Sequence, residues 1–250
     1  MISASQLRSH LEAVLEPRIP RALTPPQRPE PEMMSTGIAS IDSMTGGIPL
    51  GCLTEICGPP SSGRTSVLLA AIAECMRRDE ICALVDAGDA FDPQSAANAG
   101  VDLERLLWVR CGKEGPRQSA LGSRQVKNFV FSQNAQEPLL AESRQPITDS
   151  PFLEQALKAT DLLLQAGGFG LIVLDLADVP ISAARRIPLT TWFRFRRSVE
   201  NTSMALIILE QHPHAKSCSS LVMDFAAQQA TWSEAADQDG TQVGTHGFPP

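Results

Sequence analysis

The chain has 250 residues, enough for one α/β core with room for tails and an inserted loop. Its formal net charge of -7 excludes a protein that coats nucleic acid through bulk electrostatics, so any DNA contact must be local or come through a partner. The six cysteines show no Cys-x-x-Cys spacing, which indicates reduced thiols rather than a zinc site. The N-terminus shows no secretory signal and no apolar run could span a bilayer, so we expect a cytoplasmic protein with no membrane partner.

We expect residues 1–34 to form an N-terminal unit outside the core. Residues 5–16 place apolar side chains at helical spacing, which predicts a short amphipathic helix. Residues 17–32 contain six prolines and predict a semi-rigid linker. The helix can dock on a second copy of the chain or on another protein, or it can fold back onto its own core, and the sequence leaves these alternatives open. Its apolar positions are Leu7, Leu11, Val14 and Leu15.

Residues 53–69 contain the pattern on which the functional argument depends. A short apolar run leads into a glycine-bounded loop, and the loop opens into a helical pattern, which is the context of a phosphate-binding P-loop. Glycines at both ends of the loop let successive N–H groups point at a phosphate on the helix N-terminus. We therefore expect this loop to bind a nucleotide. The expected binding residues are Gly58, Pro59, Pro60, Ser61, Ser62, Gly63, Arg64, Thr65 and Ser66.

Arg64 stands where the P-loop pattern has lysine. A lysine ammonium is a compact charge that fits between phosphates, whereas a guanidinium is a broad planar fork. We expect nucleotide binding to survive this replacement and fast hydrolysis not to. The simpler alternative is a glycine-rich turn between a strand and a helix that binds nothing.

Further apolar runs predict the other elements of an α/β fold. Strands are expected at residues 81–86, 106–111, 170–175 and 205–211. Helices are expected at residues 151–165, with Ser150 as cap and Gly167 and Gly168 as stop, and at residues 189–199. This alternation predicts a mainly parallel sheet with helices on both faces over residues 35–232.

Two segments do not follow this pattern. Residues 112–150 are rich in Gln, Ser, Pro, Glu and Arg, which predicts an inserted flexible loop with a helix near residues 125–131. Residues 233–250 are polar with scattered glycines and are expected to be a disordered tail.

Ligands of parallel sheets bind at the carboxyl ends of the strands. Gly88, Asp175 and Gln211 fall at such ends together with the P-loop, so we expect them to converge. Asp175, after a buried strand, is the type of carboxylate that holds a magnesium ion in P-loop proteins, and Thr65 would offer its hydroxyl to the same ion. His212 and His214 flank a proline, and with no second ligand pair we do not expect them to bind a metal.

Arginines and aromatic residues alternate after Asp175. They are Arg185, Arg186, Arg194, Arg196 and Arg197, with Trp192, Phe193 and Phe195. Such a segment can track phosphates and stack bases of single-stranded DNA. It can also be one amphipathic helix with a solvated and a buried face, and we favour that interpretation.

Taken together, these residues resemble the bacterial RecA recombinase core. The resemblance covers most of residues 35–232, with residues 112–150 as an insertion. The matching motifs are Ser35-Thr-Gly37, Gly47-Ile-Pro-Leu-Gly51, Glu55 to Gly63, Val85-Asp86-Ala-Gly-Asp-Ala-Phe-Asp92-Pro93, Gly100-Val-Asp102-Leu, Val173-Leu-Asp175 and Gln211. The resemblance implies ATP and Mg²⁺ as cofactors and, in that family, a filament on single-stranded DNA with ATP held between subunits.

The departures from that family concern catalysis. Gly88 occupies the position of the glutamate that activates the attacking water, and glycine offers no base. Ser95 replaces a tyrosine that stacks on adenine, although Asp92 can still contact the base. Gln211 matches the glutamine that senses the γ-phosphate, but the segment after it is short for a DNA-binding loop. We expect no counterpart of the family's C-terminal domain within these 250 residues.

These departures, with the N-terminal helix, resemble ImuA-type proteins, diverged RecA relatives. That resemblance implies DNA repair in the SOS response and translesion synthesis, with an error-prone polymerase accessory protein or RecA as partner, and weak contact with single-stranded DNA. We expect ATP binding with weak or absent hydrolysis. The alternatives are an active DNA-dependent ATPase recombinase, in which Arg64 and Asp89 substitute for the usual groups, and a small-molecule P-loop kinase, for which no convincing lid is present.

Overall fold

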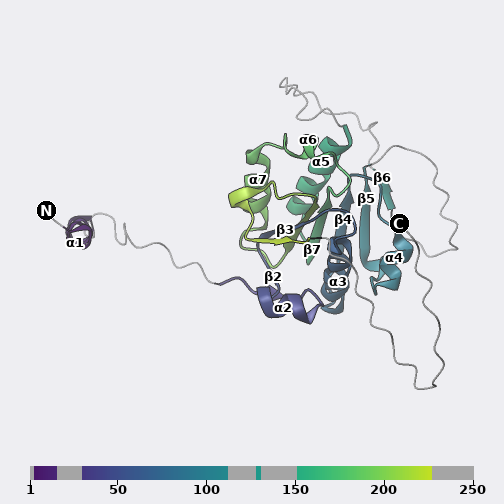
Figure 1. The fold of residues 1–250 in the computed structure, drawn as a ribbon, viewed down its shortest axis with the longest axis horizontal. Coiled ribbons are helices and arrows are strands. Elements are labelled where there is room, and N and C mark those ends of the chain that lie inside the picture. Colours follow the sequence, from purple (N-terminus) through teal and green to yellow (C-terminus); the bar gives the residue numbers. More distant parts are fainter. Residues whose placement is uncertain (1–2, 16–29, 112–127, 131–150, 227–250) are drawn as a thin grey trace, which may run out of the picture.

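The computed structural model describes residues 3–15, 30–111, 128–130 and 151–226 (Figure 1). Its central feature is a parallel sheet of seven strands in the order β6-β5-β4-β7-β8-β3-β9. The strands are β3 (Leu53–Cys57), β4 (Cys82–Asp86), β5 (Leu106–Arg110), β6 (Asn128–Val130), β7 (Leu171–Asp175), β8 (Ala205–Glu210) and β9 (Leu221–Asp224). A separate antiparallel pair joins β1 (Met33–Met34) to β2 (Ile48–Pro49). Within these ranges no helix is long and apolar enough to cross a membrane.

Helices cover both faces of the sheet, which confirms the predicted fold class (Figure 1). One apolar cluster packs α2 (Ala39–Thr45), α3 (Arg64–Arg77) and α4 (Pro93–Asn98) against one face. The other packs α5 (Pro151–Ala166), α6 (Ile181–Ala184) and α7 (Leu189–Val199) against the opposite face. Short 3-10 turns, η1 (Leu103–Arg105) and η2 (Lys216–Cys218), precede β5 and β9. Strands β3, β4 and β8 are buried at every position because both of their faces are covered.

The N-terminal helix is present as α1 (Ala4–Leu15). None of its side chains is buried, and in Figure 1 it lies apart from the sheet. Leu7, Leu11 and Val14 are 51%, 41% and 54% exposed, so the structure does not support docking of this apolar stripe on its own core. Residues 16–29 of the expected linker lie outside the described residues.

The described part of the insertion at residues 112–150 has a different secondary structure from the one expected from the sequence. A helix was predicted at residues 125–131, and this is wrong at Asn128–Val130, which form β6 beside β5. The outer edge of β5 has unpaired backbone groups, and pairing with β6 satisfies them at the cost of local helical preference. The rest of the insertion, the capping Ser150 and the tail lie outside the described residues.

Helix α7 is amphipathic, as favoured from the sequence. Trp192, Phe195 and Val199 are buried against the sheet. Phe193, on the same helix, is 47% exposed. The arginines point elsewhere: Arg194 pairs with Asp161 at 2.9 Å.

Phe195→Ala should therefore lower the free energy of unfolding by about 3–5 kcal/mol, because it removes a fully buried ring. Phe193→Ala is the matched control on the same helix and should cost less than about 1 kcal/mol. Urea denaturation of both variants measures the difference. Equal losses would contradict the orientation of α7.

Candidate nucleotide-binding site

The loop between β3 and α3 has the path expected of a P-loop. Gly58 and Gly63 adopt φ angles of 152° and 90°, and Ser61 adopts 64°. A Cβ at Gly58 would lie 2.5 Å from the carbonyl oxygen of Phe225, so only glycine fits there. The loop ends at α3, whose first N–H groups have no partners within the helix and face the loop.

The residues of this loop fit a phosphate ligand in two respects. The Ser62 hydroxyl is buried without a hydrogen-bond partner among the described atoms, so its O–H is available to donate to a phosphate oxygen. No atom lies within 4 Å of a Cβ built at Gly63, so the turn before the helix is open. Thr65 and Ser66 are exposed, as a residue that binds nucleotide-bound Mg²⁺ needs to be. Their roles stay predictions.

Arg64 is directed inward rather than toward solvent. The residue is 6% exposed. Its Nη1 donates to the carbonyl oxygens of Gly58 and Glu210, the latter at 3.1 Å, and its Nη2 donates to the carbonyl of Ala177 at 3.4 Å. These carbonyls belong to the loop itself, to the end of β8 and to the segment after β7.

Asp175 ends β7 as predicted. Burial raises its pKa to about 7, with smaller contributions from Asp86 and Asp178, while the N–H of Ala177 at 2.9 Å and the charge of Arg64 oppose the rise. Among the described residues, no group of three or more His, Cys, Asp or Glu side chains is arranged to hold a metal ion. A magnesium ion here would take most of its ligands from nucleotide phosphates and water, with Thr65 and Asp175 as the protein's contribution.

Gly88 lies beside a carboxylate that the sequence analysis missed. A Cβ at Gly88 would lie 3.0 Å from the Cβ of Asp178 and 3.5 Å from its Oδ2. Asp178 is exposed, on the turn after β7. Its side chain therefore borders the space in which a larger residue at position 88 would lie.

Asp89 is held by an ion pair. The Arg110 Nε and Nη2 donate to its two carboxylate oxygens at 2.6 and 2.8 Å. The same pairing raises the pKa of Arg110, and its guanidinium stacks over Trp108. Both oxygens of Asp89 are occupied by the guanidinium instead of facing a water molecule, which weakens the alternative in which Asp89 replaces the missing glutamate.

The remaining predicted residues have structural partners. Asp92 caps α4 by accepting hydrogen bonds from the N–H groups of Gln94 and Ser95 and from the Ser95 hydroxyl, which lower its pKa. Gln211 follows β8, and its Nε2 donates to the carbonyl of Ala177 at 2.9 Å, the oxygen that Arg64 also contacts. The structure thus brings Arg64, Gln211 and the end of β7 together, while Asp92 lies in the cap of α4.

A second cluster, missed from the sequence, lies under this site. Glu55 on β3 and Glu210 on β8 are 0% and 1% exposed. Glu55 Oε1 accepts from the N–H groups of His214 and Ala215 at 2.7 Å, and Glu210 Oε2 lies 2.8 Å from His214 Nδ1. Burial and the neighbouring Glu55 raise the pKa of Glu210 to about 10, while burial lowers that of His214. The sequence signal that could have predicted this cluster is the presence of Glu55 and Glu210 inside otherwise apolar runs.

This cluster predicts a pH dependence of stability. Because the pKa of Glu210 is raised from 4.5 to about 10, the folded state retains a proton that the unfolded state releases, so stability falls as pH rises from about 4.5 to about 10. Glu210→Gln removes this proton uptake, and its unfolding free energy should depend less on pH between 6 and 8.5 than that of the wild type. The exposed Glu104→Gln is the control. A slope for Glu210→Gln equal to that of wild type would contradict the assignment.

Sequence comparison places the chain among known proteins. Residues 22–119 match the RecA N-terminal domain. Protein RecA of Ruegeria pomeroyi is 35% identical over 148 residues, 58% of this chain and 31% of that protein. Protein RecA of Acinetobacter baylyi is 32% identical over 146 residues, with the same coverage, and that of Wigglesworthia glossinidia brevipalpis is 47% identical over 78 residues, 30% of this chain and 24% of that protein.

The chain spans less than a third of the length of these curated relatives in each alignment. The matched region contains the P-loop, β4 and β5, while β7 and β8, whose ends complete the candidate site, lie outside it. The parallel sheet with helices on both faces is consistent with this similarity to the RecA N-terminal domain. Over residues 22–119 the chain is therefore similar to the RecA N-terminal domain.

Proposed function

We propose that this chain is a RecA-like nucleotide-binding protein of DNA repair that binds ATP and Mg²⁺ with weak or absent hydrolysis and acts mainly through protein contacts. The relationship to RecA supports the general class. In this proposal the amides of the P-loop hold the phosphates, and Thr65 and Asp175 hold the magnesium ion. Residues 1–34, 35–232 and 233–250 are the N-terminal unit, the core and the tail.

The observation that favours weak hydrolysis is the absence of a free base at position 88. Gly88 has no side chain, and Asp89 is bound by Arg110. ATP supplies the γ-phosphoryl group when bound, but hydrolysis also needs a group that takes a proton from water. Asp178 is a described carboxylate that borders this position, from the turn after β7.

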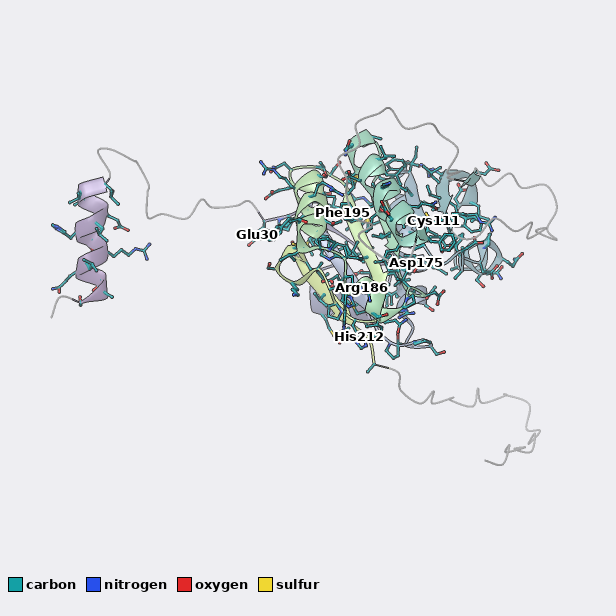
Figure 2. All side chains as sticks on the ribbon, turned by 90° about the horizontal axis from the view of Figure 1, so that it is seen from above. Glu30, Cys111, Asp175, Arg186, Phe195 and His212 are labelled. Carbon is teal, nitrogen blue, oxygen red and sulfur yellow. The ribbon has the colours of Figure 1, made fainter. Side chains whose placement is uncertain are left out.

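We further propose the ImuA-type branch, with a role in damage-induced translesion synthesis. The exposed stripe of α1 supports a protein partner, since three of its apolar side chains are at least 41% exposed. An error-prone polymerase accessory protein or RecA is the proposed partner, and self-association through α1 is the competing one. Weak contact with single-stranded DNA is proposed through the arginines of residues 185–197, of which Figure 2 labels Arg186.

An active DNA-dependent ATPase recombinase is the second candidate. The position of Asp178 favours it, because a carboxylate beside Gly88 can in principle act as the base. In that case Asp178 rather than Asp89 would replace the missing glutamate.

ATP turnover separates these two functions. Wild-type chain should hydrolyse ATP slowly with and without single-stranded DNA. The variant Gly88→Glu/Asp178→Gly/Arg64→Lys restores a carboxylate at position 88, clears the space that Asp178 occupies and restores the lysine, so turnover should rise by about 100-fold or more. Gly88→Ala/Asp178→Gly/Arg64→Lys is the matched control without the carboxylate. Vigorous DNA-stimulated turnover by the wild type, lost in Asp178→Asn, would establish the recombinase instead.

Introducing aspartates separately on the two faces of α1 tests whether its apolar stripe binds a partner. Leu7→Asp/Leu11→Asp places carboxylates in the apolar stripe and should lose the partner in pull-downs from DNA-damaged cells, because a charge is costly to bury in an apolar contact. Ser5→Asp/Ser9→Asp adds the same charge to the opposite face and should retain it. Equal recovery with both variants would remove α1 as the contact.

A further inference from the structure

We propose that Arg64 is an internal occupant of the P-loop: its guanidinium fastens the loop to the ends of β7 and β8 and thereby competes with nucleotide. The inference rests on the proposed function, since it takes the loop of residues 58–66 as the nucleotide site. It goes beyond that proposal by assigning to one side chain both the stability of the nucleotide-free loop and a low affinity for ATP.

The first step of the argument is the set of atoms that Arg64 contacts. Its guanidinium donates to the carbonyls of Gly58, Ala177 and Glu210, which belong to three segments far apart in sequence. A buried cation must find such acceptors, since loss of hydration is otherwise uncompensated. A guanidinium spreads its N–H donors over three nitrogens and can bridge acceptors that lie apart, whereas the donors of an ammonium share one nitrogen.

The second step concerns charge. The positive charge of Arg64 is already compensated by the carbonyl oxygens of Gly58, Ala177 and Glu210. A triphosphate that used this charge would have to draw the guanidinium away from these three carbonyls. A triphosphate that left Arg64 in place would lose the cation that P-loops direct at phosphate.

The third step is the effect of the replacement. A lysine at position 64 has one nitrogen and a shorter reach, so it cannot bridge the loop, β7 and β8 together. Arg64→Lys should therefore loosen the nucleotide-free loop and bind Mg-ATP more tightly. A change in stability alone is no evidence of this competition, so the affinity for Mg-ATP must be measured as well. The control is a second Arg→Lys replacement away from the site.

Arg105→Lys is that control. Arg105 Nη1 donates to the carbonyl of Met76 at 2.9 Å and the side chain pairs with Asp79, so it also connects segments through a main-chain acceptor, but at the C-terminal end of α3. The experiment measures the thermal unfolding midpoint without nucleotide and the Kd for Mg-ATP by calorimetry. Arg64→Lys should melt several degrees lower than wild type and bind Mg-ATP at least tenfold tighter. Arg105→Lys should leave the Kd unchanged.

A measurement on the wild type keeps the test independent of variant folding. Phenylglyoxal modifies accessible arginines, and mass spectrometry of the nucleotide-free protein should find Arg64 protected relative to Arg77, whose side chain is 65% exposed. Modification of Arg64 at the rate of Arg77 would overturn the proposal. A wild-type Kd equal to or lower than that of Arg64→Lys would overturn it while leaving ATP binding in place. Absence of binding in both proteins would overturn it together with the proposed nucleotide site.

Discussion

The parallel pairing of β3 with β8 and of β8 with β7 is the constraint on which the site depends. It brings three strand ends to one edge of the sheet, and there the carbonyls of Gly58, Glu210 and Ala177 surround one guanidinium. Carbonyl oxygens at the carboxyl end of a buried strand need hydrogen-bond donors. A cation at this point satisfies several of these oxygens at once. Arg64 provides that cation from the first residue of α3.

The same edge concentrates acidic groups. Asp86, Asp175 and Glu210 end neighbouring buried strands, and burial raises the pKa of Asp175 and Glu210. In a nucleotide-binding core, bound metal ions offset such a concentration of negative charge. Here two effects within the chain reduce the repulsion between these acidic groups. Asp86 accepts hydrogen bonds from Ala90, Phe91 and Trp108, and Glu210 retains its proton.

Much of the fold was predictable because four strands are continuous apolar runs and α3, α5 and α7 follow clear helical spacing. β6 and β9 were missed, since a short strand paired at an edge depends on its neighbour more than on its own residues. The path of the P-loop was predictable from its glycines. The inward direction of Arg64 and the contact of Gly88 with Asp178 were not, because they join residues up to 146 positions apart whose proximity only strand order decides.

The contact between Gly58 and the Phe225 carbonyl has a wider meaning for interpreting P-loop sequences. The segment after β9 crosses directly over the first glycine of the loop, and the Phe225 N–H donates to Cys57 at 2.8 Å. Packing alone therefore forbids a side chain at position 58, whether or not phosphate ever binds. Packing alone would preserve this glycine in a diverging lineage after the ligand is lost, so Gly58 is evidence of the architecture of the loop and not of its chemistry.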